Sequence, residues 1–211
     1  METLSPHFTI RQISESVQIC LLTDYQGIRS GTVWLEHYFG AREKARNFLS
    51  AKRQQEWLAG RACAKFLLAP MLKMQPQEII VSNSLDGRPF MAGFPEVAIS
   101  LSHSHGFAIA AVSLTGKAIG VDVEKLQERR NWRAIEQRFF SSREGASTIK
   151  DFYKGWTLKE ALWKYSGDTT IALNEMENRE GVIYIREIAQ PQIGFSMGEE
   201  QNGEFLWAVV Y

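Results

Sequence analysis

The sequence predicts an α+β fold, and two observations indicate this class. Runs of β-branched and aromatic residues occur in both halves of the 211-residue chain, between long stretches of helical periodicity. The strands and helices do not alternate strictly, which favours α+β over a parallel α/β arrangement. A chain of this length with 45% hydrophobic residues can bury a sizeable core without a metal or disulfides.

One long helix and several short strands are expected in the first half. Apolar residues at helical spacing predict a helix over 51–72, capped by Ser50 and ended by Pro70 and Pro76. A turn is expected at 86–89. Strands are expected at 17–22, 78–81, 97–101, 107–112 and 118–123.

Two further helices are expected in the second half, over 132–139 and 152–165. Strand-like runs follow at 182–188 and 205–211. The joint with the fewest structural signals is Thr115-Gly116-Lys117. We therefore expect an N-terminal subdomain over 1–115 and a C-terminal subdomain over 116–211.

Charge and composition exclude several classes of partner. Lys+Arg and Asp+Glu both number 24, so no global field attracts nucleic acid or an anionic membrane. The longest apolar stretch, 107–114, is too short to span a bilayer. The start of the chain, 1–5, lacks a secretory pattern, and two cysteines in apolar contexts fit a reducing compartment. We expect a cytoplasmic protein.

Two carboxylates, Asp122 and Glu124, lie two residues apart in a predicted strand. Residues at this spacing project from the same face, whereas Val121 and Val123 project from the other. Two carboxylates at close range repel each other, and a hard divalent cation such as Mg²⁺ relieves the repulsion. The alternative is a strand whose outer face is acidic only because it is exposed to solvent.

The helix predicted over 152–165 carries a second set of candidates. Leu158, Ala161, Leu162 and Tyr165 form its apolar stripe, and Trp156, Glu160 and Lys164 follow the opposite side. Glu160 and Lys164 also match an ordinary surface ion pair. Two tryptophans, Trp156 and Trp163, need a packing partner, however, so Glu160 is a candidate metal ligand or base and Lys164 a candidate phosphate partner.

The segment Ser100–Gly106 combines hydroxyls, imidazoles and backbone N–H groups at the end of a predicted strand. Such a turn suits a phosphate. A Ser-His hydrolytic site is an alternative, although this segment does not have the Gly-x-Ser-x-Gly pattern of a nucleophile elbow. Basic residues that include Lys44, Arg53 and Arg61 surround the first long helix. They form either a solvated face or a polyanion site.

Together and in this order, these segments resemble the 4′-phosphopantetheinyl transferases, most closely the larger, pseudo-dimeric Sfp-type class. The similar elements are Gly-Arg-Pro-Phe (87–90), Leu-Ser-His-Ser (101–104), Gly-Val-Asp-Val-Glu (120–124), Phe-Phe-Ser with a following Glu (139–144) and Trp-x-x-Lys-Glu-x-x-x-Lys (156–164). The resemblance covers 44–168.

The resemblance implies two similar α/β subdomains related by pseudo-twofold symmetry, with coenzyme A in the cleft between them. The implied reaction transfers 4′-phosphopantetheine from coenzyme A to a serine of an apo acyl, peptidyl or aryl carrier protein. The products are the holo carrier protein and 3′,5′-ADP. A single-chain pseudo-dimer further implies a monomer.

The resemblance also implies residue roles. Asp122, Glu124 and Glu160 would hold Mg²⁺. Glu160, directly or through a water, would help to deprotonate the carrier serine, and Lys164 would stabilise or protonate the leaving phosphate. In the N-terminal subdomain, Ser102 and His103 would contact the phosphates and Gly87, Arg88 and Pro89 would lie near the adenine. Lys44, Arg53 and Arg61 are candidates for further phosphate contacts.

Two alternatives use the same residues differently. A magnesium-dependent pyrophosphate hydrolase would direct water rather than serine at the pyrophosphate. A non-catalytic relative would bind coenzyme A or a carrier protein without turnover. The intact set of Asp122, Glu124, Glu160 and Lys164 argues against the second alternative.

Overall fold

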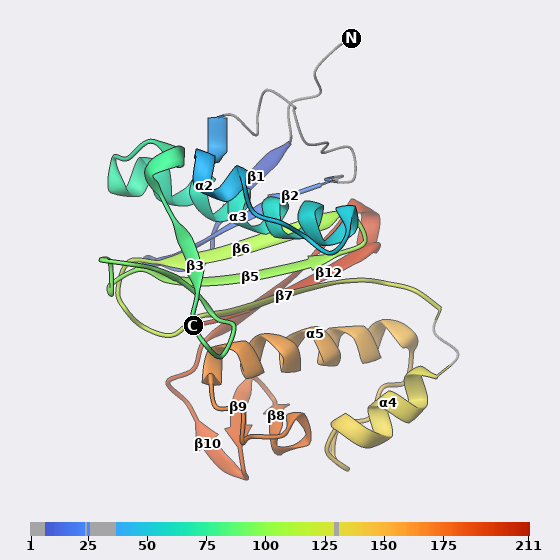
Figure 1. Ribbon diagram of the computed structural model, residues 1–211. Coiled ribbons are helices and arrows are strands. Elements are labelled where there is room, and N and C mark those ends of the chain that lie inside the picture. The colour runs from blue at the N-terminus through green and yellow to red at the C-terminus, as the bar shows by residue number, and fades with distance from the viewer. Residues whose placement is uncertain (1–6, 24, 26–36, 129–130) are drawn as a thin grey trace. The chain divides into compact units, whose positions relative to one another are not determined.

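A computed structural model describes residues 7–23, 25, 37–128 and 131–211 (Figure 1). The 1–5 segment considered above lies outside these ranges. The chain divides into two compact units, Met1–Lys117 and Ala118–Tyr211. Each unit combines antiparallel strands with helices, which confirms the α+β class.

The first unit is built on a six-stranded antiparallel sheet with the order β1-β2-β6-β5-β4-β3. Long strands at its centre pair over most of their length, for example β5 with β6 through Ser100 and Ala111. The strands are β1 (Phe8–Gln12), β2 (Val17–Leu22), β3 (Val81–Asn83), β4 (Pro89–Met91), β5 (Ala98–Ser104) and β6 (Phe107–Ser113).

The long helix α3 (Ala51–Leu72) covers one face of this sheet and buries the core of the unit against it (Figure 1). The Ser50 side chain accepts a hydrogen bond from the backbone N–H of Arg53, as an N-cap does. The helix ends at Leu72, as predicted, and Pro70 lies inside its last turn. It stops at Lys73, which adopts a left-handed conformation with φ 54°.

The strand predicted over 78–81 is wrong, because β3 begins only at Val81. A 3-10 helix, η2 (Pro76–Glu78), occupies its start, with the proline at a position that needs no backbone donor. The short helix α2 (Ala41–Lys44) precedes α3 and is held to it by a buried ion pair between Glu43 and Lys65, 2.5 Å apart.

The second unit contains two three-stranded antiparallel sheets and two helices. One sheet has the order β11-β12-β7 and the other β10-β9-β8. Figure 1 shows α5 between β7 and the second sheet. The elements are β7 (Gly120–Lys125), α4 (Trp132–Phe139), α5 (Ile149–Ser166), η3 (Leu173–Glu175), β8 (Met176–Arg179), β9 (Val182–Ile185), β10 (Ile188–Gln190), β11 (Phe195–Glu200), η4 (Gln201–Gly203) and β12 (Phe205–Val210).

Helix α5 packs closely on β7 and β12 because its apolar stripe meets them. Leu158, Ala161 and Leu162 are buried with Ala208 of β12, which confirms the predicted stripe. The helix starts three residues before the predicted position, where Thr148 and Asp151 form a capping box. At Gly120 the strand lies so close to α5 that a Cβ atom would be 2.6 Å from the backbone nitrogen of Tyr165.

The single strand predicted over 182–188 is instead two strands, β9 and β10. Arg186 and Glu187 both have positive φ and form the two-residue turn between them. Neither residue is a glycine, so the usual sequence signal for such a turn is missing. No helix in the described part of the chain is both long and apolar enough to cross a membrane.

Candidate active site

Strand β7 separates two kinds of side chain. Val121 and Val123 are fully buried on one face, and Asp122 and Glu124 project from the other, toward α5. Asp122 is only 5% exposed. The alternative, a strand whose acidic face is only exposed to solvent, is therefore wrong. A buried carboxylate needs compensating partners.

Helix α5 supplies those partners from one row of side chains spaced by four residues. The Lys164 ammonium donates to Asp122 Oδ1 at 2.7 Å and to the Val121 carbonyl at 3.0 Å. Two turns earlier, the Trp156 indole N–H donates to Glu124 Oε1 at 3.3 Å. Lys164 thus forms its ion pair with Asp122 across to the strand, rather than the helical surface pair with Glu160 considered from the sequence.

Glu160 lies between these two contacts, and its surroundings disfavour its charge. Burial raises the pKa of the Glu160 carboxyl, and the negative charges of Asp122 and Glu124 raise it further. The Lys164 ammonium opposes the rise. The structure therefore places Asp122, Glu124 and Lys164 near enough to Glu160 to act on its charge.

The chemical type of these donors suits a hard cation. Three carboxylates give only oxygen ligands, and a divalent cation would relieve the repulsion that raises the pKa of Glu160. Among the described residues, however, no three His, Cys, Asp or Glu side chains lie close enough together to hold a metal ion as they stand. The Lys164 ammonium forms an ion pair with Asp122 in this structure.

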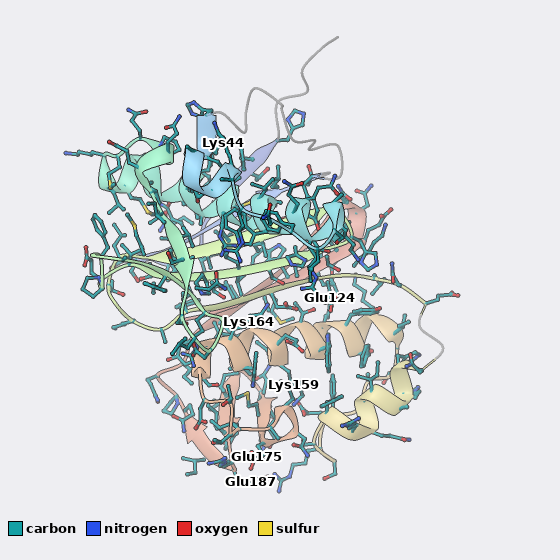
Figure 2. All side chains as sticks on the ribbon, in the orientation of Figure 1. Lys44, Glu124, Lys159, Lys164, Glu175 and Glu187 are labelled. Carbon is teal, nitrogen blue, oxygen red and sulfur yellow. The ribbon has the colours of Figure 1, made fainter. Side chains whose placement is uncertain are left out.

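Lys159 lies on the opposite side of α5 and has a different role from its neighbour Glu160. Figure 2 shows Lys159 directed away from Glu124 and Lys164. Its buried ammonium pairs with Glu144 at 2.7 Å and donates to the carbonyls of Leu173 and Met176. Burial lowers the pKa of Lys159, and Glu144 opposes that effect.

The same side of α5 borders a cavity of about 350 Å³ that Lys159 and Glu144 help to line. None of Asp122, Glu124 and Glu160 lines it. The candidate site is therefore defined by converging side chains and not by this hollow. Lys159 and Glu144 received no role in the sequence analysis, because the residue type alone does not show whether a charged side chain is buried or exposed to solvent.

In the first unit, Ser102 and His103 lie within β5 and not in a turn. The predicted polar turn is reduced to His105 and Gly106, whose φ values of 46° and 88° give a tight hairpin. Ser102 is buried, and the His103 Nδ1 atom lies 3.9 Å from Glu56 Oε1 on α3.

The three basic candidates occupy different environments. Lys44 and Arg53 are exposed, at the end of α2 and in the first turn of α3. Arg61 is buried, donates to the Val81 carbonyl at 3.2 Å and to the Asn83 side chain, and stacks on a tryptophan. Burial and the charge of a nearby arginine lower its pKa to about 10. Its observed contacts are structural.

Gly87, Arg88 and Pro89 lie at the β3–β4 hairpin. Gly87 has φ 89°, a conformation that favours glycine, and its N–H donates to the Ser84 carbonyl at 3.0 Å. Arg88 is exposed and pairs with Asp86 at 2.9 Å, and Pro89 begins β4. The predicted turn at 86–89 is therefore confirmed. Lys44, the other labelled candidate of this unit, lies on α2 (Figure 2).

Two family models match the chain in succession. The 4′-phosphopantetheinyl transferase N-terminal domain matches residues 42–113, and the 4′-phosphopantetheinyl transferase superfamily model matches residues 118–209. The chain belongs to the 4′-phosphopantetheinyl transferase superfamily. The two matches contain all the candidate site residues named above.

Named relatives agree with this membership of the phosphopantetheinyl transferases. The 4′-phosphopantetheinyl transferase HetI of Nostoc sp. is 30% identical over 64% of this chain and 61% of its own length. A phosphopantetheinyl transferase of Thraustochytrium sp. is 29% identical over 60% of this chain and 51% of its own. The 4′-phosphopantetheinyl transferase AcpT of Escherichia coli K12 is 33% identical over 61% and 64%. The matched region thus spans between half and two thirds of these relatives.

Proposed function

We propose that this chain transfers the 4′-phosphopantetheine arm of coenzyme A to a serine of an apo carrier protein. The observation that carries the proposal is the convergence of Asp122, Glu124, Glu160 and Lys164 between β7 and α5. Transfer of a phosphoryl-type group depends mainly on charge neutralisation and positioning, which such a set can supply.

In the proposed reaction, the serine oxygen forms a bond to the β-phosphorus of coenzyme A. The bond from that phosphorus to the bridging oxygen breaks, and 3′,5′-ADP leaves. Glu160 takes the serine proton. Its raised pKa supports this role, because a base is more effective when its pKa lies nearer the working pH.

Lys164 is proposed to stabilise the charge that develops on the leaving phosphate. Its ammonium has three N–H groups, and Asp122 Oδ1 and the Val121 carbonyl accept from it. A third N–H group remains for a phosphate oxygen. A cation held in this fixed position needs no rearrangement when the negative charge develops.

Asp122, Glu124 and Glu160 are the residues that would hold Mg²⁺. When bound, the ion would neutralise pyrophosphate oxygens and so lower the barrier to attack. The support for this part of the proposal is the all-oxygen donor set and the mutual repulsion of the carboxylates.

The first unit is proposed to contribute phosphate and adenine contacts. The first turn of α3 contains Lys52 and Arg53 and no acidic residue, so two cations lie at the positive end of a long helix. Such an arrangement favours an anion there. Lys44, Arg53, Ser102 and His103 remain the candidates for phosphates and Gly87–Pro89 for the adenine. Arg61 is the weakest candidate, because its guanidinium is already engaged.

Further parts of the proposal concern the setting of the reaction. We propose a cytoplasmic monomer that acts on an acyl, peptidyl or aryl carrier protein, without nucleic-acid or membrane partners. The pseudo-twofold symmetry and the role of each subdomain also stay predictions.

The decisive experiment is an intact-mass assay of apo carrier proteins incubated with coenzyme A, MgCl₂ and this protein. We expect a mass gain of one phosphopantetheine that is lost when a chelator is added. Hydrolysis of coenzyme A without transfer would favour the pyrophosphate hydrolase instead. Binding of coenzyme A with neither transfer nor hydrolysis, across carriers from fatty-acid, polyketide and peptide systems, would favour the non-catalytic alternative.

A further inference from the structure

Trp156 makes a contact that the proposed chemistry has not yet used. Its indole N–H donates to Glu124 Oε1 at 3.3 Å, and the donor and acceptor come from different elements, α5 and β7. Indole nitrogen can donate but cannot accept, so Glu124 Oε1 is the acceptor in this contact. Trp156 is itself no candidate ligand.

The ring of Trp156 is held in place from two sides. It stacks on Phe152 with centroids 6.1 Å apart and meets Phe139 edge to face at 5.6 Å. Phe152 is completely buried, and Trp156 itself is half-buried. An indole fixed by two aromatic rings presents its N–H in a defined direction, which a flexible donor could not do.

Trp156 and Lys164 restrain the two carboxylates of β7 from opposite ends of one helical row. Lys164 holds Asp122, Trp156 holds Glu124, and Glu160 lies midway between them on α5. The two contacts therefore fix the separation and orientation of both strand carboxylates relative to Glu160. Hydrogen bonds of this kind orient metal ligands in proteins.

We infer that Trp156 is a positioning residue that orients Glu124 for the cation, an inference that rests on the proposed function. The indole N–H, rather than the bulk of the ring, carries this role. Trp156→Phe is the sharp variant, because phenylalanine keeps most of the aromatic packing and lacks the donor. Trp163→Phe is the matched control, since Trp163 lies on the same helix and is 39% exposed.

The test measures Mg²⁺ binding directly, by calorimetric titration of the full chain with coenzyme A present and carrier protein absent. We expect Trp156→Phe to weaken Mg²⁺ binding about 10- to 100-fold and Trp163→Phe to leave it unchanged. In the transfer assay, Trp156→Phe should need a higher Mg²⁺ concentration for half-maximal rate. It should approach the wild-type kcat at saturating Mg²⁺, which a merely structural defect would not allow.

Trp156→His gives a second variant, since a smaller ring with an N–H group should restore part of the affinity. Equal Mg²⁺ affinities of Trp156→Phe and Trp163→Phe, with wild-type binding and transfer intact, would overturn the positioning role alone. A wild-type chain that neither binds Mg²⁺ nor transfers phosphopantetheine would overturn both this inference and the proposed function. Circular dichroism melts of the variants show whether the fold is retained.

Discussion

Glu160 combines an unfavourable environment with a proposed catalytic role. Burial and two neighbouring carboxylates raise its pKa, which means that its ionised form is less stable in the folded chain than in water. Active sites often keep such groups because the same features make a carboxylate a better base. Stability and chemistry therefore make opposite demands on this side chain.

Substitution Glu160→Gln tests both demands at once. We expect kcat for transfer to fall roughly 10²- to 10⁴-fold, because the proton acceptor is lost. We expect the free energy of unfolding to stay level or increase, since a buried charge beside two like charges is removed. Transfer kinetics and urea unfolding measure the two effects. Normal turnover in this variant would exclude Glu160 as the base.

Single residues were predictable where their type and spacing limited the possible environments. Asp122 and Glu124 could be assigned to one face of a strand from spacing alone, and the contact of Trp156 was anticipated as a need for a packing partner. Arg61 and Lys159 could not be judged in this way. Their burial depends on residues such as Asn83 and Glu144 that are distant in sequence.

Among the elements, α5 and β7 depend on a single glycine for their close approach. A Cβ atom at Gly120 would collide with the Ala161 carbonyl oxygen and lie 2.6 Å from the Tyr165 nitrogen. Both obstacles are helix backbone, which cannot rotate away as a side chain can. The absence of a side chain at Gly120 therefore determines how close α5 lies to Asp122, two residues further along the strand.

Gly120→Ala should therefore force α5 away from β7. We expect a loss of about 3 kcal/mol in the free energy of unfolding, at the upper end for overpacking. Transfer should fall on the order of 10²-fold, because small displacements of reacting groups have large effects. Gly145→Ala is the control, since a Cβ there meets nothing within 4 Å. Equal stabilities of the two variants, measured by thermal melts, would contradict the close-packing interpretation.

Lys159 and Glu144 join α5 to the segment that precedes it. The pair is buried on the lysine side, and Lys159 also donates to two carbonyls at η3 and β8. Lys159→Met should lower the free energy of unfolding by about 3 to 5 kcal/mol, because the partly buried Glu144 carboxylate loses its cationic partner and two carbonyls lose a donor.

A double-mutant cycle with Glu144→Gln separates the pair from its surroundings. We expect Lys159→Met to cost about 1 to 3 kcal/mol less when Glu144 is already glutamine. Urea unfolding of the four proteins gives the coupling. Additive effects would show that the carbonyl contacts, and not the ion pair, account for the loss.

Element positions followed from the sequence where periodicity was long and caps were standard. The bounds of α3 and α4 and of β2 were predicted to the residue, because Ser50 and strong patterns mark them. The strands β1, β4, β8 and β11 and the short helix α2 were missed. The β9–β10 turn was hidden because its left-handed residues, Arg186 and Glu187, are not glycine or asparagine.

At the scale of the whole molecule, two buried tyrosines make the fold sensitive to alkali. Burial raises the pKa of Tyr25 to about 12, with the charge of Glu56 adding to the rise, and burial likewise raises the pKa of Tyr38 to about 12. In an unfolded chain the pKa of tyrosine is about 10. Between these pH values the unfolded chain releases protons that the folded chain keeps, so stability falls as pH increases.

Each tyrosine should contribute a loss of roughly 2 to 3 kcal/mol between about pH 10 and pH 12. Tyr25→Phe removes one titrating group, so its unfolding free energy should fall less steeply over this range than that of the wild type. Urea unfolding at a series of pH values measures both slopes. Identical slopes would show that Tyr25 keeps an ordinary pKa in the folded chain.

The α+β class followed from pattern and composition, because it depends on local periodicity. The network around the site depends on contacts between distant segments, such as Trp156 with Glu124 and Lys164 with Asp122. Periodicity gives the face on which a side chain lies but not what that face meets.

The alternation along β7 also limits how the gene can change. Val121 and Val123 serve the core while Asp122 and Glu124 serve the site, and β12 fixes this arrangement by pairing Val121 with Val209 and Asp122 with Ala208. A one-residue insertion or deletion in the strand would bury the carboxylates among apolar groups and turn the valines toward α5. Insertions and deletions here would disrupt the fold and the candidate site together, whereas substitutions keep the register.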